Sequence, residues 1–119
     1  MKKTIVIGAS DDSTRYSYKA TIALQKNHHE VIPVGIKEGE INGIKIITGT
    51  PDIINVDTVT LYVNPKNQSY WYDYIIGLKP KRVIFNPGTE NPEFEKLLQQ
   101  NKIETIEACT LVMLSVGNY

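Results

Sequence analysis

The chain lacks several features that define particular protein classes. Its only cysteine is Cys109, which excludes an internal disulfide and any metal site built from several cysteines. Long hydrophobic runs are missing too, because the apolar segment 4–8 that follows Met1-Lys2-Lys3 is too short for a signal peptide or a membrane span. From these absences we expect a soluble, cytoplasmic protein in a reducing compartment.

Net charge is also missing. Thirteen basic residues balance thirteen acidic ones, so no long-range field favours nucleic acid or an anionic membrane as a partner. Any anion must therefore be recognised by a few local groups. At 119 residues, and without repeats or a linker, the chain is expected to form one domain over residues 1–119.

The chain does contain short β-branched runs that alternate with longer segments of helical period. This alternation is typical of parallel sheets built through right-handed crossovers. Strands are predicted at 4–8, 30–34, 45–47, 58–63, 82–85 and 104–106, the third of them weak and peripheral. Helices are predicted at 16–27, at 66–77 and from Asn91-Pro92 onward. The predicted fold class is therefore α/β, a Rossmann-like, doubly wound and mainly parallel sheet in a single domain.

In such a sheet, ligands bind beside the carboxyl ends of the strands. The first loop at that edge begins with Gly8, Ala9 and Ser10, which let the backbone approach a ligand, and the helix that follows offers N–H groups to a phosphate. The loop lacks the full G-x-G-x-x-G fingerprint, because serines occupy positions 10 and 13. A tight turn without a ligand explains it equally well.

The end of the second predicted strand argues against NAD. An NAD site places an acidic residue there for the ribose 2′-hydroxyl, whereas this chain has Gly35, Ile36 and Lys37. Lys37 could instead pair with a phosphorylated ribose, either the 3′-phosphate of coenzyme A or the 2′-phosphate of NADP. The alternative is an ordinary solvated lysine.

Five segments taken together closely resemble the stand-alone CoA-binding domain proteins. They are Gly8-Ala9-Ser10 with Tyr18, residues 31–34, residues 57–65, residues 81–90 and residues 107–112. These proteins are similar to the amino-terminal CoA-binding domain of the succinyl-CoA synthetase α subunit. The resemblance covers nearly the whole chain, and it implies a Rossmann-like fold with coenzyme A lying across the strand ends.

The resemblance also implies a set of cofactor-binding residues. Gly8, Ala9 and Ser10 would face the pyrophosphate with Arg15 nearby, and Asn64 and Pro65 would lie along the nucleotide. The opposite wall would consist of Asn86, Pro87, Gly88 and Thr89. The chain departs from the family at Gly35-Ile36, where members commonly carry Asn-Pro.

Two catalytic alternatives fail on position. A receiver domain would use Asp11, Asp12 and a phosphoacceptor Asp57, but Asp57 precedes its strand and so lies at the opposite edge of the sheet. An acyl-CoA ligase needs a nucleophile that carries phosphate, and His28 and His29 stand before the second strand, at the wrong end. No third ligand accompanies them, so no metal site is predicted.

Two further features have ordinary explanations. Cys109 follows the last strand and could approach the pantetheine end of a ligand, although a small buried side chain accounts for it as well. The aromatic residues at 70–74 resemble a stacking platform for bases, but a helix would turn Trp71 and Tyr72 away from Tyr70 and Tyr74. Core packing with a possible dimer surface therefore explains them better.

The sequence therefore predicts a protein that binds coenzyme A or an acyl-CoA. We expect a non-catalytic binding module, such as a sensor or carrier, because no catalytic constellation can be assembled at the ligand edge. A homodimer or a partner protein is compatible with this role. The alternative is an NADP-dependent oxidoreductase or another nucleotide-binding enzyme.

Overall fold

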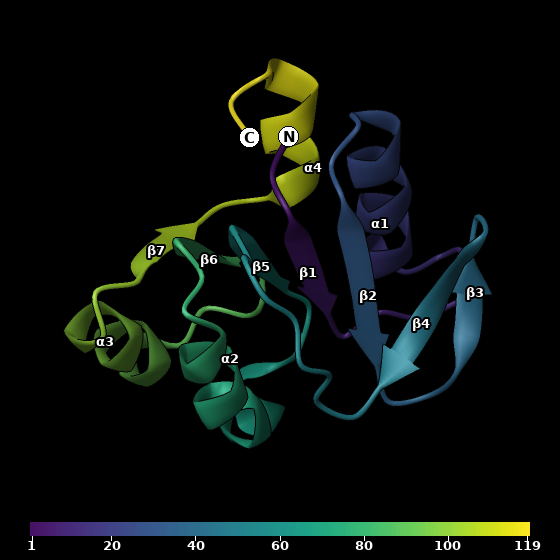
Figure 1. The fold of residues 1–119 in the computed structure, drawn as a ribbon. Helices are drawn as coiled ribbons and strands as arrows, with labels where there is room; N and C mark the ends of the chain where they lie inside the picture. Colours follow the sequence, from purple (N-terminus) through teal and green to yellow (C-terminus); the bar gives the residue numbers. More distant parts are fainter.

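The computed structural model describes all of residues 1–119 and contains one seven-stranded sheet with the strand order β3-β4-β2-β1-β5-β6-β7 (Figure 1). The strands are β1 (Thr4–Ile7), β2 (Val31–Gly35), β3 (Gly39–Ile41), β4 (Ile44–Thr48), β5 (Thr58–Leu61), β6 (Arg82–Phe85) and β7 (Glu104–Glu107). All neighbours pair in parallel except β3, which runs antiparallel to β4 at one edge.

Helices cover both faces of this sheet (Figure 1). They are α1 (Tyr16–Lys26), α2 (Tyr72–Leu78), α3 (Pro92–Gln100) and α4 (Thr110–Val116), with short 3-10 helices at Pro65–Asn67 and Ser69–Trp71. Successive residues of β1 serve opposite faces, as the strand period of two requires: Ile5 and Ile7 pack with α2 and α3, and Val6 packs with α1 and α4. The predicted doubly wound, mainly parallel α/β fold is confirmed.

The order of the strands reverses between β1 and β5. From β1 the chain moves through α1 to β2 on one side, and β5 then pairs on the other side of β1. Ile7, at the end of β1, is in register with Val34 of β2 and Leu61 of β5, so the loops that leave these strands start at the same level. The connections that follow β1 and β5 run toward opposite edges of the sheet, and this leaves a crevice between the two strand ends.

The predicted helix at 66–77 is wrong in its first half. Residues 65–71 form two 3-10 turns, and the α-helix starts only at Tyr72. The buried Gln68 side chain lies between the two turns and donates to the carbonyl oxygens of Val63 (2.8 Å) and Thr89 (2.7 Å), which ties this segment to its surroundings in the 3-10 arrangement. A tertiary contact overrides the local helical preference here.

The sequence analysis also missed two elements. Strand β3 is short, but its turn to β4 is Asn42-Gly43, both with positive φ (47° and 85°), which is the usual signal of a tight hairpin. Helix α4 begins three residues after the end of β7, and the residue before it, Cys109, makes no capping hydrogen bond with its own side chain. None of the helices combines the length and the apolar character that a membrane crossing needs.

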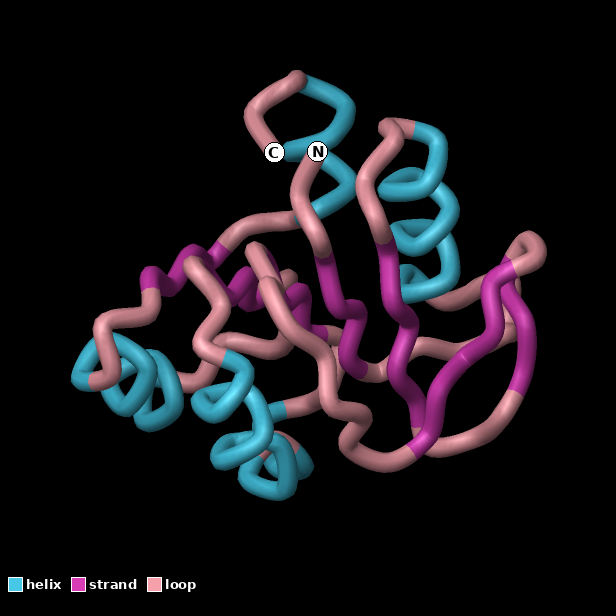
Figure 2. The backbone as a smooth tube through the Cα atoms, viewed as in Figure 1, coloured by secondary structure: helices cyan, strands magenta, loops and turns pink.

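Gly35 permits the closest backbone approach at the strand ends. A Cβ at this position would collide with the carbonyl oxygen of Ala9, which belongs to the loop after β1. The N–H groups of Gly8 and Ala9 both donate to the carbonyl of Val34 (3.0 and 2.9 Å), the residue before Gly35. The first two loops therefore touch through backbone atoms. Figure 2 traces both loops where they leave the ends of β1 and β2.

We predict that Gly35→Ala lowers the free energy of unfolding by about 1–3 kcal/mol, because the added methyl group must push the Ala9 carbonyl away. Gly77→Ala is the matched control: Gly77 lies in α2, its added Cβ would meet nothing within 4 Å, and alanine favours a helix by about 0.5–1 kcal/mol. Urea unfolding of both variants measures the difference. Equal stability of the two would contradict the proposed contact.

Candidate functional site

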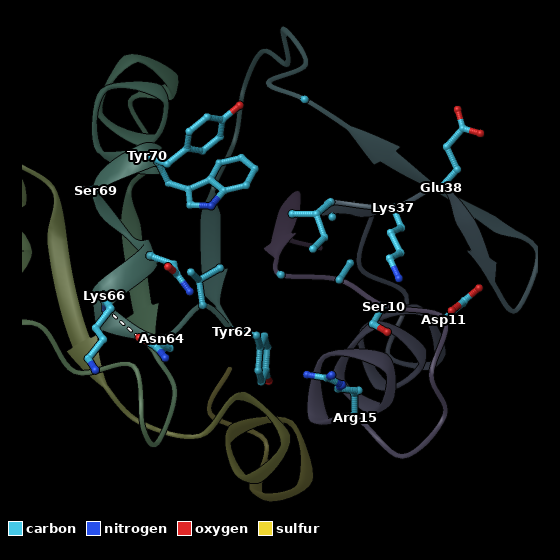
Figure 3. Close-up of a pocket in the computed structure, with 18 residues that line it drawn as sticks. Ser10, Asp11, Arg15, Lys37, Glu38, Tyr62, Asn64, Lys66, Ser69 and Tyr70 are labelled. Carbon is cyan, nitrogen blue, oxygen red and sulfur yellow. Dashed lines mark hydrogen bonds between the residues drawn. The ribbon is translucent and has the colours of Figure 1, made fainter.

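A cavity of about 960 Å³ opens where the strand order reverses (Figure 3). Its walls come mainly from the loop between β1 and α1, the loop between β2 and β3, and the segment from Tyr62 to Trp71 after β5. Gly49, which follows β4, completes the lining. This is the place where open α/β sheets bind ligands.

The first wall has two backbone donors that the fold leaves free. The N–H groups of Gly8 and Ala9 are used by Val34, but those of Ser10 and Asp11 have no acceptor in the protein. Gly8 adopts a φ of 92°, and a Cβ there would lie 2.7 Å from the carbonyl oxygen of Tyr62. The loop thus turns tightly against the end of β5, and its next two residues, whose N–H groups are free, line the cavity.

Two cationic side chains stand beside this loop. Arg15 precedes α1, and its guanidinium extends toward Tyr62 in Figure 3, with only a long ion pair of 3.8 Å to the Asp12 carboxylate. Lys37 extends from the loop after β2 toward Ser10 and has no ion-pair partner. Backbone donors and flexible cations together can bind a phosphate group.

Carboxylates partly offset the positive charge of this cavity. Asp11 and Glu38 line it as well, and the Asp11 carboxylate lies beside Gly39, where a Cβ would be 2.8 Å from its Oδ2. Two of the three cations in the lining, Arg15 and Lys37, therefore lie near Ser10, and the third, Lys66, lies in the 3-10 turn on the opposite wall. This arrangement fits the prediction that a balanced chain must recognise an anion locally.

Tyr62 lies between the two halves of the cavity. Its ring faces the space near Arg15 (Figure 3), and its hydroxyl is buried without a hydrogen-bond partner of standard geometry. Burial raises the pKa of this phenol far above its ordinary value, although the nearby Thr110 and Thr60 hydroxyls oppose the shift. Tyr62 therefore remains neutral and contributes an apolar surface.

Of the predicted site residues, the structure brings one group together in the cavity lining. These are Gly8, Ala9, Ser10, Arg15, Lys37 and Asn64. Asn64 also caps the adjacent 3-10 turn, since its Oδ1 accepts from the N–H of Lys66 (2.8 Å). Pro65, the first residue of that turn, is exposed and outside the lining.

The remaining predicted residues lie outside the lining, after β6 and β7. Asn86 is buried, and its amide donates to Thr60 Oγ1 (2.6 Å) and the Leu61 carbonyl (2.8 Å), while its Oδ1 accepts from the N–H of Thr110 (2.9 Å). Its side chain thus joins β5, β6 and the start of α4. All of its hydrogen-bonding groups are occupied by the fold.

The residues that follow Asn86 hold the same loop. Thr89 is buried and donates its hydroxyl to the carbonyl of Asn86 (2.8 Å). Pro87 and Gly88 are exposed, and Gly88 has a φ of 92° in a turn that Glu90 closes by accepting its N–H (2.8 Å). Cys109 is half-buried at the residue before α4.

Gln68 connects this loop to the cavity wall, and no sequence pattern had singled it out. It is fully buried; besides donating to Val63 and Thr89, its Oε1 accepts from the amide of Asn91 (3.0 Å). The Asn91 side chain in turn caps α3 by accepting from the N–H of Phe94 (3.2 Å). A chain of side-chain amides thus ties the segment 86–91 to the wall formed by residues 62–71.

Several lining residues were not among the predicted site residues. They are Asp11, Gly35, Ile36, Glu38, Gly49, Tyr62, Val63, Lys66, Asn67, Ser69, Tyr70 and Trp71. Tyr70 and Trp71 had been assigned to core packing with a possible dimer surface; Trp71 does belong to the core, whereas Tyr70 is exposed at the cavity. The two 3-10 turns determine that the Tyr70 ring faces outward and the Trp71 ring faces inward, and the sequence analysis did not predict these turns.

The histidines and Asp57 lie at the opposite, amino-terminal edge, as expected. His29 Nδ1 accepts from the N–H of Lys2 (2.9 Å), and its ring packs against Tyr119. Asp57 precedes β5, forms an ion pair with Lys81 (3.8 Å) and accepts from the Thr58 hydroxyl (2.7 Å). These groups stabilise the far edge of the sheet and cannot reach the cavity.

We predict that Asn86→Asp lowers the free energy of unfolding by about 1–3 kcal/mol, because a carboxylate cannot donate to the buried Leu61 carbonyl. Asn118→Asp is the control, since Asn118 is exposed and its side chain makes no hydrogen bond. Urea unfolding at neutral pH measures both variants. An Asn86 variant as stable as the control would refute the structural role of this amide.

Comparison with known proteins gives results consistent with this geometry. The crystal structure of an uncharacterized protein is 56% identical, with a TM-score of 0.98, and the match covers 100% of this chain and 98% of that one. A hypothetical protein from Pyrococcus horikoshii is 26% identical, with a TM-score of 0.88 and coverage of 97% and 82%. A protein from Thermus thermophilus is 22% identical, with a TM-score of 0.83 and coverage of 99% and 91%, which supports the fold alone.

No curated protein matches the chain. Among protein families, the one described as "CoA binding domain" matches residues 2–115, a span that runs from before β1 into α4 and includes every loop of the cavity. The match over almost the whole chain shows that this protein belongs to the CoA binding domain family.

Proposed function

We propose that this protein binds coenzyme A in the cavity at the carboxyl ends of β1, β2 and β5. The observation that carries the proposal is the set of anion-binding groups around Ser10: two free backbone N–H groups, Arg15 and Lys37. They stand at the switch point of a fold whose family is defined by binding coenzyme A. The diphosphate of the ligand would lie against this loop.

The cavity favours binding over chemistry. Its lining contains no histidine and no cysteine, and its carboxylates and cations belong to exposed loops. Nothing in the lining pairs a nucleophile with a base, which is the arrangement that acyl transfer or hydrolysis would require. We infer a binding module that senses, carries or delivers coenzyme A or an acyl-CoA in the cytoplasm.

The first test is a thermal-shift experiment with coenzyme A, NAD and NADP. A ligand that binds only the folded state stabilises it by RT ln(1 + [L]/Kd), about 2.7 kcal/mol at a hundredfold excess over Kd. Coenzyme A should therefore raise Tm by several degrees and NAD should not. A larger shift from NADP than from coenzyme A would support the oxidoreductase alternative and refute the proposal.

The second test asks whether Lys37 recognises the 3′-phosphate of the ribose. Dephospho-CoA, which lacks that phosphate, should bind more weakly than coenzyme A by about 1 kcal/mol, or about fivefold in Kd. Lys37→Ala should remove this difference and leave the affinity for dephospho-CoA unchanged. Lys96→Ala is the control, because Lys96 is equally exposed but lies on α3, outside the cavity.

Calorimetric titration of the two ligands into the three proteins gives the required constants. If Lys37→Ala weakens both ligands by the same factor, Lys37 contacts the diphosphate, and the assignment to the 3′-phosphate is wrong. Coenzyme A binding itself would still stand in that case.

A further inference from the structure

Two large apolar side chains of the cavity lining remain largely exposed. Tyr70 is 68% exposed and Ile36 is 88% exposed, and both line the cavity. The Tyr70 hydroxyl makes no hydrogen bond to any other residue. Other exposed apolar side chains, such as Tyr16 and Val112, lie outside the lining.

Tyr70 is nevertheless held firmly in place. Its ring meets that of Trp71 edge to face, with centroids 5.0 Å apart and an interplanar angle of 84°. Trp71 is only 6% exposed and belongs to the hydrophobic core, where its ring centroid lies 5.9 Å from that of Tyr74. Two residues before Tyr70, the buried Gln68 fixes the backbone. Tyr70 is therefore an exposed ring on a rigid support.

The position of Tyr70 relative to the anion-binding groups suggests what it contacts. Figure 3 shows Tyr70 on one side of the cavity and Lys37 with Ser10 on the other. Ile36 immediately precedes Lys37, so the second apolar side chain belongs to the loop that carries the cation. A ligand that fills this space needs an anionic part and a flat apolar part, and a nucleotide has both.

We propose that Tyr70 and Ile36 hold the adenine base of the ligand between them, with Tyr70 as the stacking surface. This inference rests on the proposed binding of coenzyme A and adds the orientation of the ligand: the base lies against the segment after β5 and the loop after β2, and the diphosphate lies at Ser10. Stacking on an aromatic ring requires only the π-face of the base. Asn67 and Ser69, which also line the cavity beside Tyr70, offer polar groups to the edge of the base.

The chain provides its own reporter for this contact. Trp71 is the only tryptophan, lines the cavity and touches the Tyr70 ring. A base that stacks on Tyr70 changes the surroundings of the indole, so its fluorescence should change when coenzyme A is added. Adenosine 3′,5′-bisphosphate, which keeps the base and lacks the pantetheine arm, should produce the same kind of change.

The test compares Tyr70→Ala, Tyr70→Phe and Tyr16→Ala by titrating both ligands and following Trp71 fluorescence, with calorimetry as a second measurement. Tyr70→Ala should weaken coenzyme A and adenosine 3′,5′-bisphosphate by a similar factor of about five or more, since stacking on one aromatic ring contributes about 1–3 kcal/mol per base. Tyr70→Phe should bind like the unmodified protein. Tyr16→Ala is the matched control, because Tyr16 is also 68% exposed but lies outside the cavity.

The outcomes separate this inference from the proposed function. If coenzyme A fails to bind the unmodified protein, the proposed function is wrong. If coenzyme A binds but Tyr70→Ala weakens it no more than Tyr16→Ala does, only the stacking assignment is overturned. The assignment also fails if Tyr70→Ala weakens coenzyme A but not adenosine 3′,5′-bisphosphate, because Tyr70 would then contact the pantetheine arm.

Discussion

The backbone of the loop after β1 lies against the ends of both neighbouring strands with no side chain between them. On one side the Ala9 carbonyl rests on Gly35, and on the other Gly8 lies against the Tyr62 carbonyl. Because these contacts and the Val34 carbonyl use the backbone of Gly8 and Ala9, the next free N–H groups are those of Ser10 and Asp11. The position of these two free N–H groups is thus set by the backbone contacts between the loop after β1 and the ends of β2 and β5.

A second layer of hydrogen bonds supports the cavity from a distance. Asn86, Gln68 and Asn91 are buried side-chain amides that connect the end of β6 and the start of α3 to the wall after β5. A buried amide must satisfy both its donor and its acceptor groups, so each of these residues tolerates little change. One of the segments that carry the family resemblance, residues 81–90, therefore includes residues that stabilise the wall of the cavity and do not line it.

The charged groups of this chain act only over short distances. Cations and carboxylates are present together in the cavity, and the chain carries no net charge. Attraction over long distances cannot select a ligand here, so the proposed recognition would rest on direct contact with backbone donors, Arg15, Lys37 and the apolar surfaces of Tyr62 and Tyr70. A site of this kind suits a ligand with separate anionic and apolar parts.

The sequence by itself determined the fold class, because alternation of β-branched runs and helical periods is a local property of the chain. It also determined which end of each strand carries the polar loops, and hence the positions of Gly8, Ser10 and Lys37. It could not show which of those loops face one another. The order of the strands decides this, and it places the loops after β6 and β7 one and two strands beyond the switch point.

Tertiary structure also decided how the aromatic residues are used. A continuous helix from residue 66 would have placed Tyr70 on the same face as Tyr74, whereas the two 3-10 turns bury Trp71 and leave Tyr70 at the cavity. The buried Gln68 side chain stabilises those turns through partners 5 and 21 residues away. Contacts with residues distant in sequence leave no periodic pattern, which is why only the three-dimensional structure could reveal the orientation of Tyr70.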